Sequence, residues 1–215
     1  MPKFFTSKFI NVIFVILLPI LFVLKFYNNK ENDKNILLLS KYSDLIKKYC
    51  SILSIEPRKY ASIIYGELKT NYDDFDRFDE IRARLGFDPS VGFAQIKIST
   101  ANWIEANFTD NLIIFRSSNS DELINKMITD STNILYSAFY IKLINSKLKK
   151  KFYRKPSILL LASYYARGID YDRENDLDSL YHNRVGITAE EFYNSDKLLD
   201  YFPKWFFILQ SNFFQ

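Results

Sequence analysis

The sequence predicts a mainly α-helical protein with little β-strand, and three observations lead to this fold class. Apolar side chains recur at spacings of three and four residues along much of the chain, which is the period of an amphipathic helix. Hydrophobic residues make up 48% and aromatic residues 17% of the 215 positions, and only five are glycine, which favours a packed core over disorder. One short segment, residues 91–98, is better suited to an extended conformation than to a helix.

The N-terminal residues 1–27 are predicted to form an uncleaved signal anchor, a transmembrane helix. Residues 9–24 are apolar apart from Asn11 and Pro19. As a helix this run would span about 24 Å, a little less than the hydrocarbon core of a bilayer at about 30 Å. No small residues follow the run, so a site for signal-peptide cleavage is missing. A core helix of the domain is the alternative.

After the anchor, residues 28–35 are polar and charged and are expected to form a linker, and residues 36–215 are expected to form one domain. The basic N-terminus favours an orientation with that end inside the cell. The sequence therefore predicts a single-pass protein of the cytoplasmic (inner) membrane, with its domain on the exported, periplasmic side.

Charge and cysteine content exclude several classes of function. The net charge is +4, and Lys3, Lys8 and Lys25 supply three of these charges; the rest of the chain, with 26 basic and 25 acidic groups, carries +1. This balance gives no basic face for nucleic acid. Cys50 and His182 are the single cysteine and histidine, so no disulfide, metal site or cofactor is expected. A Cys-His nucleophile pair has no local motif to support it, and Cys50 is expected to be buried.

The helices of the domain are predicted from apolar spacing and from capping residues. Residues 36–49 carry a stripe that includes Leu38, Tyr42 and Ile46, and Pro57 stands at the first position of the next helix. Residues 71–88 are acid-rich and are expected to form an irregular insertion. Further helices are expected at 99–108 (capped by Ser99), 121–127, 131–148, 156–166 (opened by Pro156 and ended by Gly168) and from Thr188, with Glu191 completing a capping box.

The connecting segments are predicted from their polar or basic composition. Residues 147–155 are expected to form a basic turn and residues 170–183 a polar loop. The aromatic tail after Pro203 is expected to pack back on the domain, with a membrane-surface role as the alternative.

Glu67 is the candidate catalytic residue. Tyr60, Ile63 and Ile64 lie at i, i+3 and i+4, and Glu67 follows on the same helical face. Ionising a carboxylate on a half-buried face is costly, so we expect a raised pKa, as a general acid near neutral pH requires. A surface glutamate at the edge of an amphipathic helix is the alternative.

Three motifs follow Glu67 and resemble, in this order, the lysozyme-like fold of lytic transglycosylases and goose-type lysozymes. The resemblance covers residues 60–168, about half of the chain. The matching segments are Ile63-Ile64-Tyr65-Gly66-Glu67, Gly92-Phe93-Ala94-Gln95-Ile96, Asn133-Ile134 with Ala138 and Tyr140, and Ala162 with Tyr165 and Gly168. The sequence departs from the family in two places. The asparagine that the family has after the tyrosine is replaced by Ala166, or by Tyr165 if Tyr164 is the matching tyrosine, and the gap between Glu67 and Gln95 is longer.

The resemblance implies cleavage of the β-1,4 bond between N-acetylmuramic acid and N-acetylglucosamine in peptidoglycan. Glu67 would act first as acid and then as base, so that the muramic-acid 6-hydroxyl forms a 1,6-anhydro ring. Peptidoglycan glycan strands and the membrane are then the partners. The remaining residues implied in the site are Gly92, Phe93, Ala94 and Gln95 along the groove, Tyr165 or the competing Tyr164 with its hydroxyl toward Glu67, and Asn133 and Tyr140 as structural support.

Three other functions remain open at this point. A hydrolytic muramidase would need a second carboxylate, for which Asp79, Glu80 and Asp88 are candidates, although exposure on the insertion is expected for them. An inactive lysozyme-fold protein that binds glycan or acts as a scaffold would fit the replaced asparagine. An anchored helical interaction protein unrelated to lysozymes would place Glu67 on an exposed surface. The sequence makes no prediction of oligomeric state.

Overall fold

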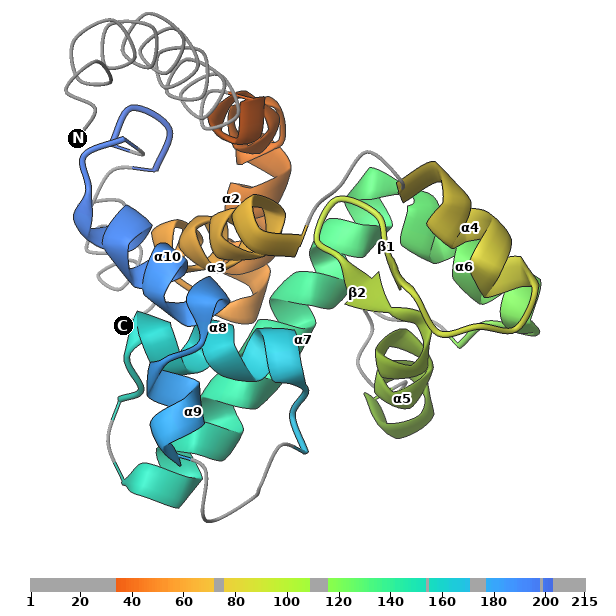
Figure 1. Cartoon of the computed structure of the whole chain (residues 1–215). Coiled ribbons are helices and arrows are strands. Elements are labelled where there is room, and N and C mark those ends of the chain that lie inside the picture. The colour runs from red at the N-terminus through yellow and green to blue at the C-terminus, as the bar shows by residue number, and fades with distance from the viewer. Residues whose placement is uncertain are drawn as a thin grey trace, which may run out of the picture.

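The computed structural model describes residues 34–71, 76–108, 116–153, 155–170, 177–197 and 199–202 (Figure 1). The predicted anchor at 1–27, most of the predicted linker and the aromatic tail after Pro203 lie outside these residues. Residues 34 and 35, assigned to the linker from the sequence, already belong to a helix. Within the described ranges, no helix is both long and apolar enough to cross a membrane.

The prediction of a mainly helical protein with little strand is confirmed. Residues 34–41 are helical and lead into the first named helix. The elements that follow in chain order are α2 (Ser43–Leu53), α3 (Pro57–Asn71), α4 (Asp76–Arg84), β1 (Ser90–Val91), β2 (Ile96–Lys97), α5 (Ile98–Phe108), α6 (Ser120–Ile128), α7 (Asp130–Phe152), α8 (Ile158–Arg167), α9 (Leu177–Tyr181) and α10 (Arg184–Asn194).

Two groups of elements are joined by the long helix α7 (Figure 1). On one side lie α2, α3, α8, α9 and α10, and on the other side lie the β1–β2 hairpin with α4, α5 and α6. The hairpin is antiparallel, with Ser90 paired to Lys97 and Val91 to Ile96. Helix α7 contacts α2 and α8 in the first group and β2 and α6 in the second, so it joins the two groups into one core.

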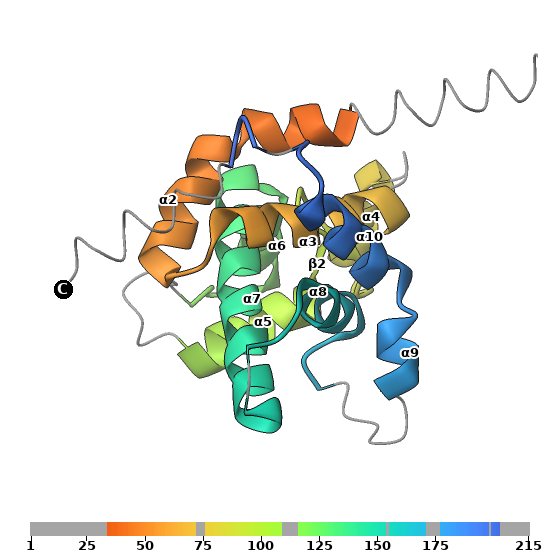
Figure 2. The same cartoon turned by 90° about the vertical axis from the view of Figure 1, so that its left-hand side faces the viewer.

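Helix α3 is buried on almost all sides, so the predicted apolar stripe is only part of its buried surface. Tyr60, Ile63 and Ile64 are fully buried, as the period of the stripe predicted. Helix α10 covers α3 from another side and also packs on α8, as both views show (Figure 2). This close approach requires two glycines, because a Cβ on Gly66 would lie 2.6 Å from the carbonyl oxygen of Val185 and one on Gly186 would lie 2.7 Å from that of Leu159.

In the first helices, the buried face is rotated slightly from the predicted one. Leu39, Ile46, Cys50 and Leu53 are buried, whereas Tyr42 is only partly covered. The expectation that Cys50 is a buried thiol is confirmed, and burial raises its pKa.

The acid-rich segment was expected to be irregular, and this prediction is wrong for α4. The helix is stabilised by pairs between Arg82 and Asp79 (3.0 Å, i,i+3) and between Arg84 and Glu80 (3.0 Å, i,i+4). The acidic composition that predicts a solvated loop therefore belongs to a helix in which acids and arginines pair along the surface.

Several predicted helix ends also need correction. Helix α7 continues through the predicted basic turn to Phe152, and α9 lies within the predicted polar loop. Ser157, not Pro156, precedes α8, and its hydroxyl accepts a hydrogen bond from the backbone N–H of Leu160 (3.2 Å). The preference of proline for the start of a helix thus predicted where α8 begins to within two residues, but it did not predict that Ser157 is the N-cap.

The same correction applies to the helices that begin near Ser99 and Thr188. Ser99 lies inside α5, where Asp88 accepts hydrogen bonds from its backbone N–H (2.8 Å) and hydroxyl (2.7 Å). Thr188 lies inside α10, whose N-cap is Asn183; the Asn183 side chain accepts from the N–H of Gly186 (3.2 Å). Of the predicted extended segment 91–98, only residues 91, 96 and 97 are in strands; residues 92–95 form a turn, and residue 98 begins α5.

Candidate functional site

Glu67 is a buried carboxylate with one oxygen that has no hydrogen-bond partner. It lies near the C-terminal end of α3 with 5% of its surface exposed. Asn71, one turn later, donates its side-chain N–H to Oε1 (2.8 Å), and Oε2 is left without a partner. Burial raises the pKa of Glu67, and the hydrogen bond from Asn71 opposes this rise. The net rise in pKa favours the protonated form of the Glu67 carboxyl over the ionised form.

A second buried glutamate in the described part of the chain shows what a structural carboxylate looks like here. Glu105 accepts hydrogen bonds from the backbone N–H (2.6 Å) and hydroxyl (2.9 Å) of Ser117 and from the hydroxyl of Tyr136, and it pairs with Lys126 at 3.4 Å. Both Glu105 oxygens are satisfied, as is usual for a buried acid. Glu67 departs from that rule, which marks it as a candidate functional group.

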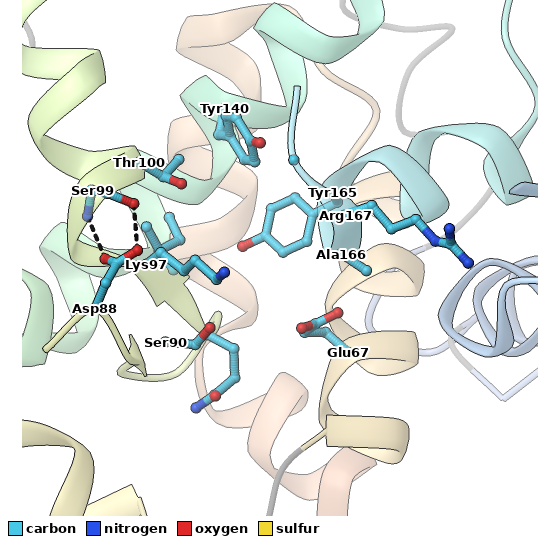
Figure 3. Close-up of a pocket in the computed structure, with 13 residues that line it drawn as sticks. Glu67, Asp88, Ser90, Lys97, Ser99, Thr100, Tyr140, Tyr165, Ala166 and Arg167 are labelled. Atoms are coloured by element: carbon cyan, nitrogen blue, oxygen red, sulfur yellow. Dashed lines mark hydrogen bonds between the residues drawn. The ribbon is translucent and has the colours of Figure 1, made fainter. Parts of the chain in front are cut away.

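The unsatisfied carboxylate lies on the wall of a cavity of about 220 Å³ (Figure 3). Side chains from α3, from the hairpin and the start of α5, from α7 and from the end of α8 meet there. Three of the residues singled out from the sequence line it together, namely Glu67, Gln95 and Tyr165. Tyr140, predicted as structural support, lines it as well.

The turn between β1 and β2 brings Gln95 to this cavity. Gly92 has φ +74°, and a Cβ there would lie 2.5 Å from Asn133 Nδ2, so glycine serves both the turn and the packing against α7. Gln95 also has a positive φ (53°), and its backbone N–H and side-chain N–H both donate to the carbonyl of Gly92 (3.1 Å each). The backbone is therefore held in an uncommon conformation directly at the cavity.

Asn133 holds that turn in place from α7. Its side-chain oxygen accepts from the N–H of Ala94 (2.7 Å), and its amide donates to the carbonyls of Val91 (2.9 Å) and Met127 (2.8 Å). Asn133 has no exposed surface. Asn133 therefore ties the turn and the end of α6 to α7 from within the core.

Tyr165 supports the same turn. Its hydroxyl donates to the carbonyl of Ala94 (2.6 Å) rather than to Glu67, which corrects the direction implied by the resemblance. Its ring lies 5.5 Å from that of Tyr140, whose hydroxyl accepts from the N–H of Ile169 (2.8 Å). The competing Tyr164 is 1% exposed and does not line the cavity. The geometry therefore favours Tyr165 for the position in the motif.

Gly92, Phe93 and Ala94 lie behind the cavity wall. None of the three is among its lining residues. Ala94 is fully buried, and Phe93 packs its ring edge-on against Tyr42 with 4.9 Å between ring centroids. Their observed part in the site is to position Gln95.

Of the three acids considered as a second carboxylate, only Asp88 reaches the cavity. In Figure 3 Asp88 and Glu67 lie on opposite sides of the space, and the dashed lines mark the two hydrogen bonds from Ser99 to Asp88. Asp88 is exposed, as expected from its position in the insertion. Asp79 and Glu80 pair with arginines on α4 and do not line the cavity.

Sequence reasoning missed several polar residues of this site, among them Lys97, Arg167 and Asn71. Lys97 extends from β2 toward the interior of the cavity in Figure 3, and Arg167 lines its edge while its guanidinium donates to the hydroxyl of Ser179 (3.0 Å). Asn71 could have been found, because a residue four positions after Glu67 shares its helical face. The positions of Lys97 and Arg167 at the cavity depend on how the hairpin and α8 pack together. The spacing of residues along the sequence does not predict this packing.

The described residues contain no group of three or more histidine, cysteine, aspartate or glutamate side chains placed to hold a metal ion. No protein-family model, no curated protein and no solved structure matches the chain. The chemistry of the site must therefore be argued from the residues themselves.

Proposed function

We propose that the protein cleaves the β-1,4 glycosidic bond between N-acetylmuramic acid and N-acetylglucosamine in peptidoglycan, as a lytic transglycosylase. One observation carries the proposal: Glu67 is buried at the wall of a cavity, has a raised pKa and has one oxygen without a protein partner. A carboxyl whose pKa is raised retains its proton to higher pH, and such a group can deliver that proton to a glycosidic oxygen.

The proposed reaction requires a single protein carboxylate. Protonated Glu67 gives its proton to the leaving 4-oxygen of N-acetylglucosamine while the bond to the anomeric carbon of the muramic acid breaks. The resulting Glu67 carboxylate takes the proton of the 6-hydroxyl of the same muramic acid. The oxygen of this hydroxyl then bonds to the anomeric carbon. Glu67 ends the cycle protonated, and the products are a free 4-hydroxyl and a 1,6-anhydro ring.

A lysozyme-like fold is part of this proposal. The four motif segments, far apart in the sequence, contribute to one region around Glu67: α3 carries the acid, the turn at 92–95 is held by Asn133, and Tyr165 donates to that turn. A mutual arrangement of this kind supports the resemblance more strongly than the separate motifs do.

A hydrolytic muramidase is the second candidate, and the presence of Asp88 at the same cavity favours it. Water activated by Asp88 would then replace the 6-hydroxyl as nucleophile. Both Asp88 oxygens already accept hydrogen bonds from Ser99, which lowers their availability as a base and keeps transglycosylation ahead. An inactive glycan-binding or scaffold protein is the third candidate, since Ala166 lines the cavity in place of the asparagine.

For localisation we retain the anchor proposed from the sequence. Residues 1–27 would hold the protein in the cytoplasmic membrane, with the domain on the exported side where peptidoglycan lies. The apolar run at 9–24 and the basic residues before it support this proposal.

Mass spectrometry of digested peptidoglycan tests the function. Full-length protein in non-ionic detergent is incubated with purified glycan strands, beside Glu67→Gln and, as a matched control, Glu191→Gln at an exposed position of α10. We expect anhydromuramic products from the wild type and the control and none from Glu67→Gln. Products with reducing ends would favour hydrolysis, and Asp88→Asn should then abolish them. No cleavage by folded protein would contradict both enzymatic proposals.

A further inference from the structure

A second cavity, of about 180 Å³, lies at the other end of α3 from Glu67. Its walls come from the residues that precede α3, from the first turn of α3, from the second half of α7, and from the start of α8 and the residues before it. Lys59 and Glu67 are eight positions apart on α3, so the two cavities are separated by about 12 Å of helix. The second cavity therefore takes no part in the chemistry proposed for Glu67.

Three lysines line this cavity together with one carboxylate. Lys59 comes from α3, Lys149 from α7 and Lys155 from the residues before α8, and Glu56 is the single acid. Three ammonium groups and one carboxylate give the lining a net charge of +2. Burial, followed by the charge of Lys155 and then by that of Lys149, lowers the pKa of Lys59, whereas Glu56 raises it. The lysines are thus close enough to repel one another.

The one carboxylate is already engaged. Glu56 accepts a hydrogen bond from the hydroxyl of Tyr193 (2.8 Å) through Oε1, and its Oε2 lies 3.8 Å from Lys59 Nζ. A single acid cannot neutralise three lysines, and like charges that face one space destabilise the fold unless an anion joins them.

The volume and lining of the cavity can accommodate a small tetrahedral anion together with water. A volume of about 180 Å³ equals the share of roughly six water molecules in the liquid. The remaining lining residues are the apolar Ile55, Ile141 and Leu161 and the uncharged Ser54 and Asn145, so the lysines supply all of its positive charge. Lysine ammonium groups act as point charges that suit phosphate, whereas arginine is favoured where a planar carboxylate is bound by two parallel bonds.

We propose that this cavity binds a phosphate group through Lys59, Lys149 and Lys155. A phosphate group carries about −1.5 to −2 near pH 7, which matches the net charge of the lining. The group could be free inorganic phosphate or the phosphodiester in the headgroup of a membrane phospholipid. The phosphodiester carries only a single negative charge, but its two free oxygens are acceptors of the same kind for the lysines. The proposal does not depend on the activity proposed for Glu67.

Isothermal titration calorimetry of the full chain in non-ionic detergent, at constant ionic strength and without phosphate in the buffer, tests the proposal. The probes are inorganic phosphate and the short-chain, soluble lipid dihexanoyl phosphatidylglycerol. Lys149→Gln and Lys155→Gln change exposed side chains and should fold, and Lys150→Gln is the matched control, since it is the next exposed residue on α7 and does not line the cavity.

We expect binding at one site, with affinity about tenfold or more lower in Lys149→Gln and Lys155→Gln and within about twofold of the wild type in Lys150→Gln. Loss of phosphate binding in the two variants would support a site for a free ion. Binding of the lipid alone, lost in the same variants, would support a headgroup site. No binding of either probe, or binding that the cavity variants leave unchanged, would overturn the proposal.

Discussion

Replacement of Asn133 by alanine should be among the most damaging substitutions on α7, although Asn133 does not line the candidate site. The side chain is fully buried and makes three hydrogen bonds to the backbone of Val91, Ala94 and Met127. Alanine removes all three bonds and leaves two carbonyls and one N–H buried without partners. The loss of stability therefore comes from the backbone groups of other segments that lose their partner, and not from the asparagine side chain itself.

The magnitude follows from the number of backbone groups left unpaired. A hydrogen bond contributes about 0.5–1.5 kcal/mol net, and a buried polar group that loses its partner costs about 1–3 kcal/mol. Three bonds at about 1 kcal/mol each give a loss of about 3 kcal/mol in the free energy of unfolding. Because a domain of ordinary stability has about 5–15 kcal/mol, the variant should still fold but with much less margin.

Urea unfolding of the full chain in non-ionic detergent, followed by circular dichroism, measures this loss. The control is Asn102→Ala, at an exposed position of α5, which should stay within about 0.5 kcal/mol of the wild type. Cleavage of peptidoglycan should also fall in Asn133→Ala with Glu67 intact, because the turn that carries Gln95 loses its support. A loss for Asn133→Ala no larger than that of the control would refute the reasoning.

Three further substitutions test other parts of the structure. Glu67→Gln should unfold at a higher temperature than the wild type at pH 7, but this difference should disappear below about pH 4. The pKa of Glu67 is raised in the folded state, so the wild type loses stability as the pH rises from the unfolded-state pKa through the folded-state pKa. Glutamine does not ionise, so the variant does not lose this stability. An equal difference in melting temperature at both pH values would contradict this account. Gly186→Ala should cost about 1–3 kcal/mol in urea unfolding, because its Cβ would meet the carbonyl of Leu159 at 2.7 Å; an unchanged urea midpoint would mean that α10 can shift freely. Tyr165→Phe should cost about 1 kcal/mol and slow cleavage, since the carbonyl of Ala94 loses its donor; a variant with unchanged stability would show that water replaces the hydroxyl.

The parts of the fold that the sequence could predict are those governed by local spacing. The stripe of Tyr60, Ile63 and Ile64 placed Glu67 on a buried face, because a helix repeats every 3.6 residues. Helix ends were less predictable, since Asn183 and Thr188 both have the chemistry of an N-cap and tertiary packing selects Asn183.

Helix α4 was missed although a signal was present. Arg82 follows Asp79 by three residues and Arg84 follows Glu80 by four, which is the spacing of ion pairs along a helix. The abundance of acids favours a solvated loop, whereas the spacing of the charges favours a helix, and the structure follows the spacing. Charge spacing is the better guide in such a segment.

The two cavities were beyond local reasoning for another reason. Asp88 and Lys97 reach the Glu67 cavity through the hairpin register, which pairs Ser90 with Lys97. Lys149 and Lys155 were read as part of a basic turn, and only the continuation of α7 to Phe152 aligns Lys149 with α3. Packing between segments far apart in the sequence determines which residues line each cavity. The spacing of residues along the chain does not predict such packing.

The way α10 covers α3 has a consequence for the order in which the nascent chain can fold. Tyr65 of α3 stacks on Phe192 of α10 with 3.5 Å between ring centroids, and Arg58 donates to the carbonyl of Tyr193, 135 residues later (3.0 Å from Nε). Contacts so distant in sequence form late, after local helices. The helix that carries Glu67 therefore stays uncovered until residues 184–194 have left the ribosome. Chains interrupted before Arg184 should expose α3 and α8 to proteases, so the Glu67 cavity should have a stable wall only in chains that have been synthesised through α10.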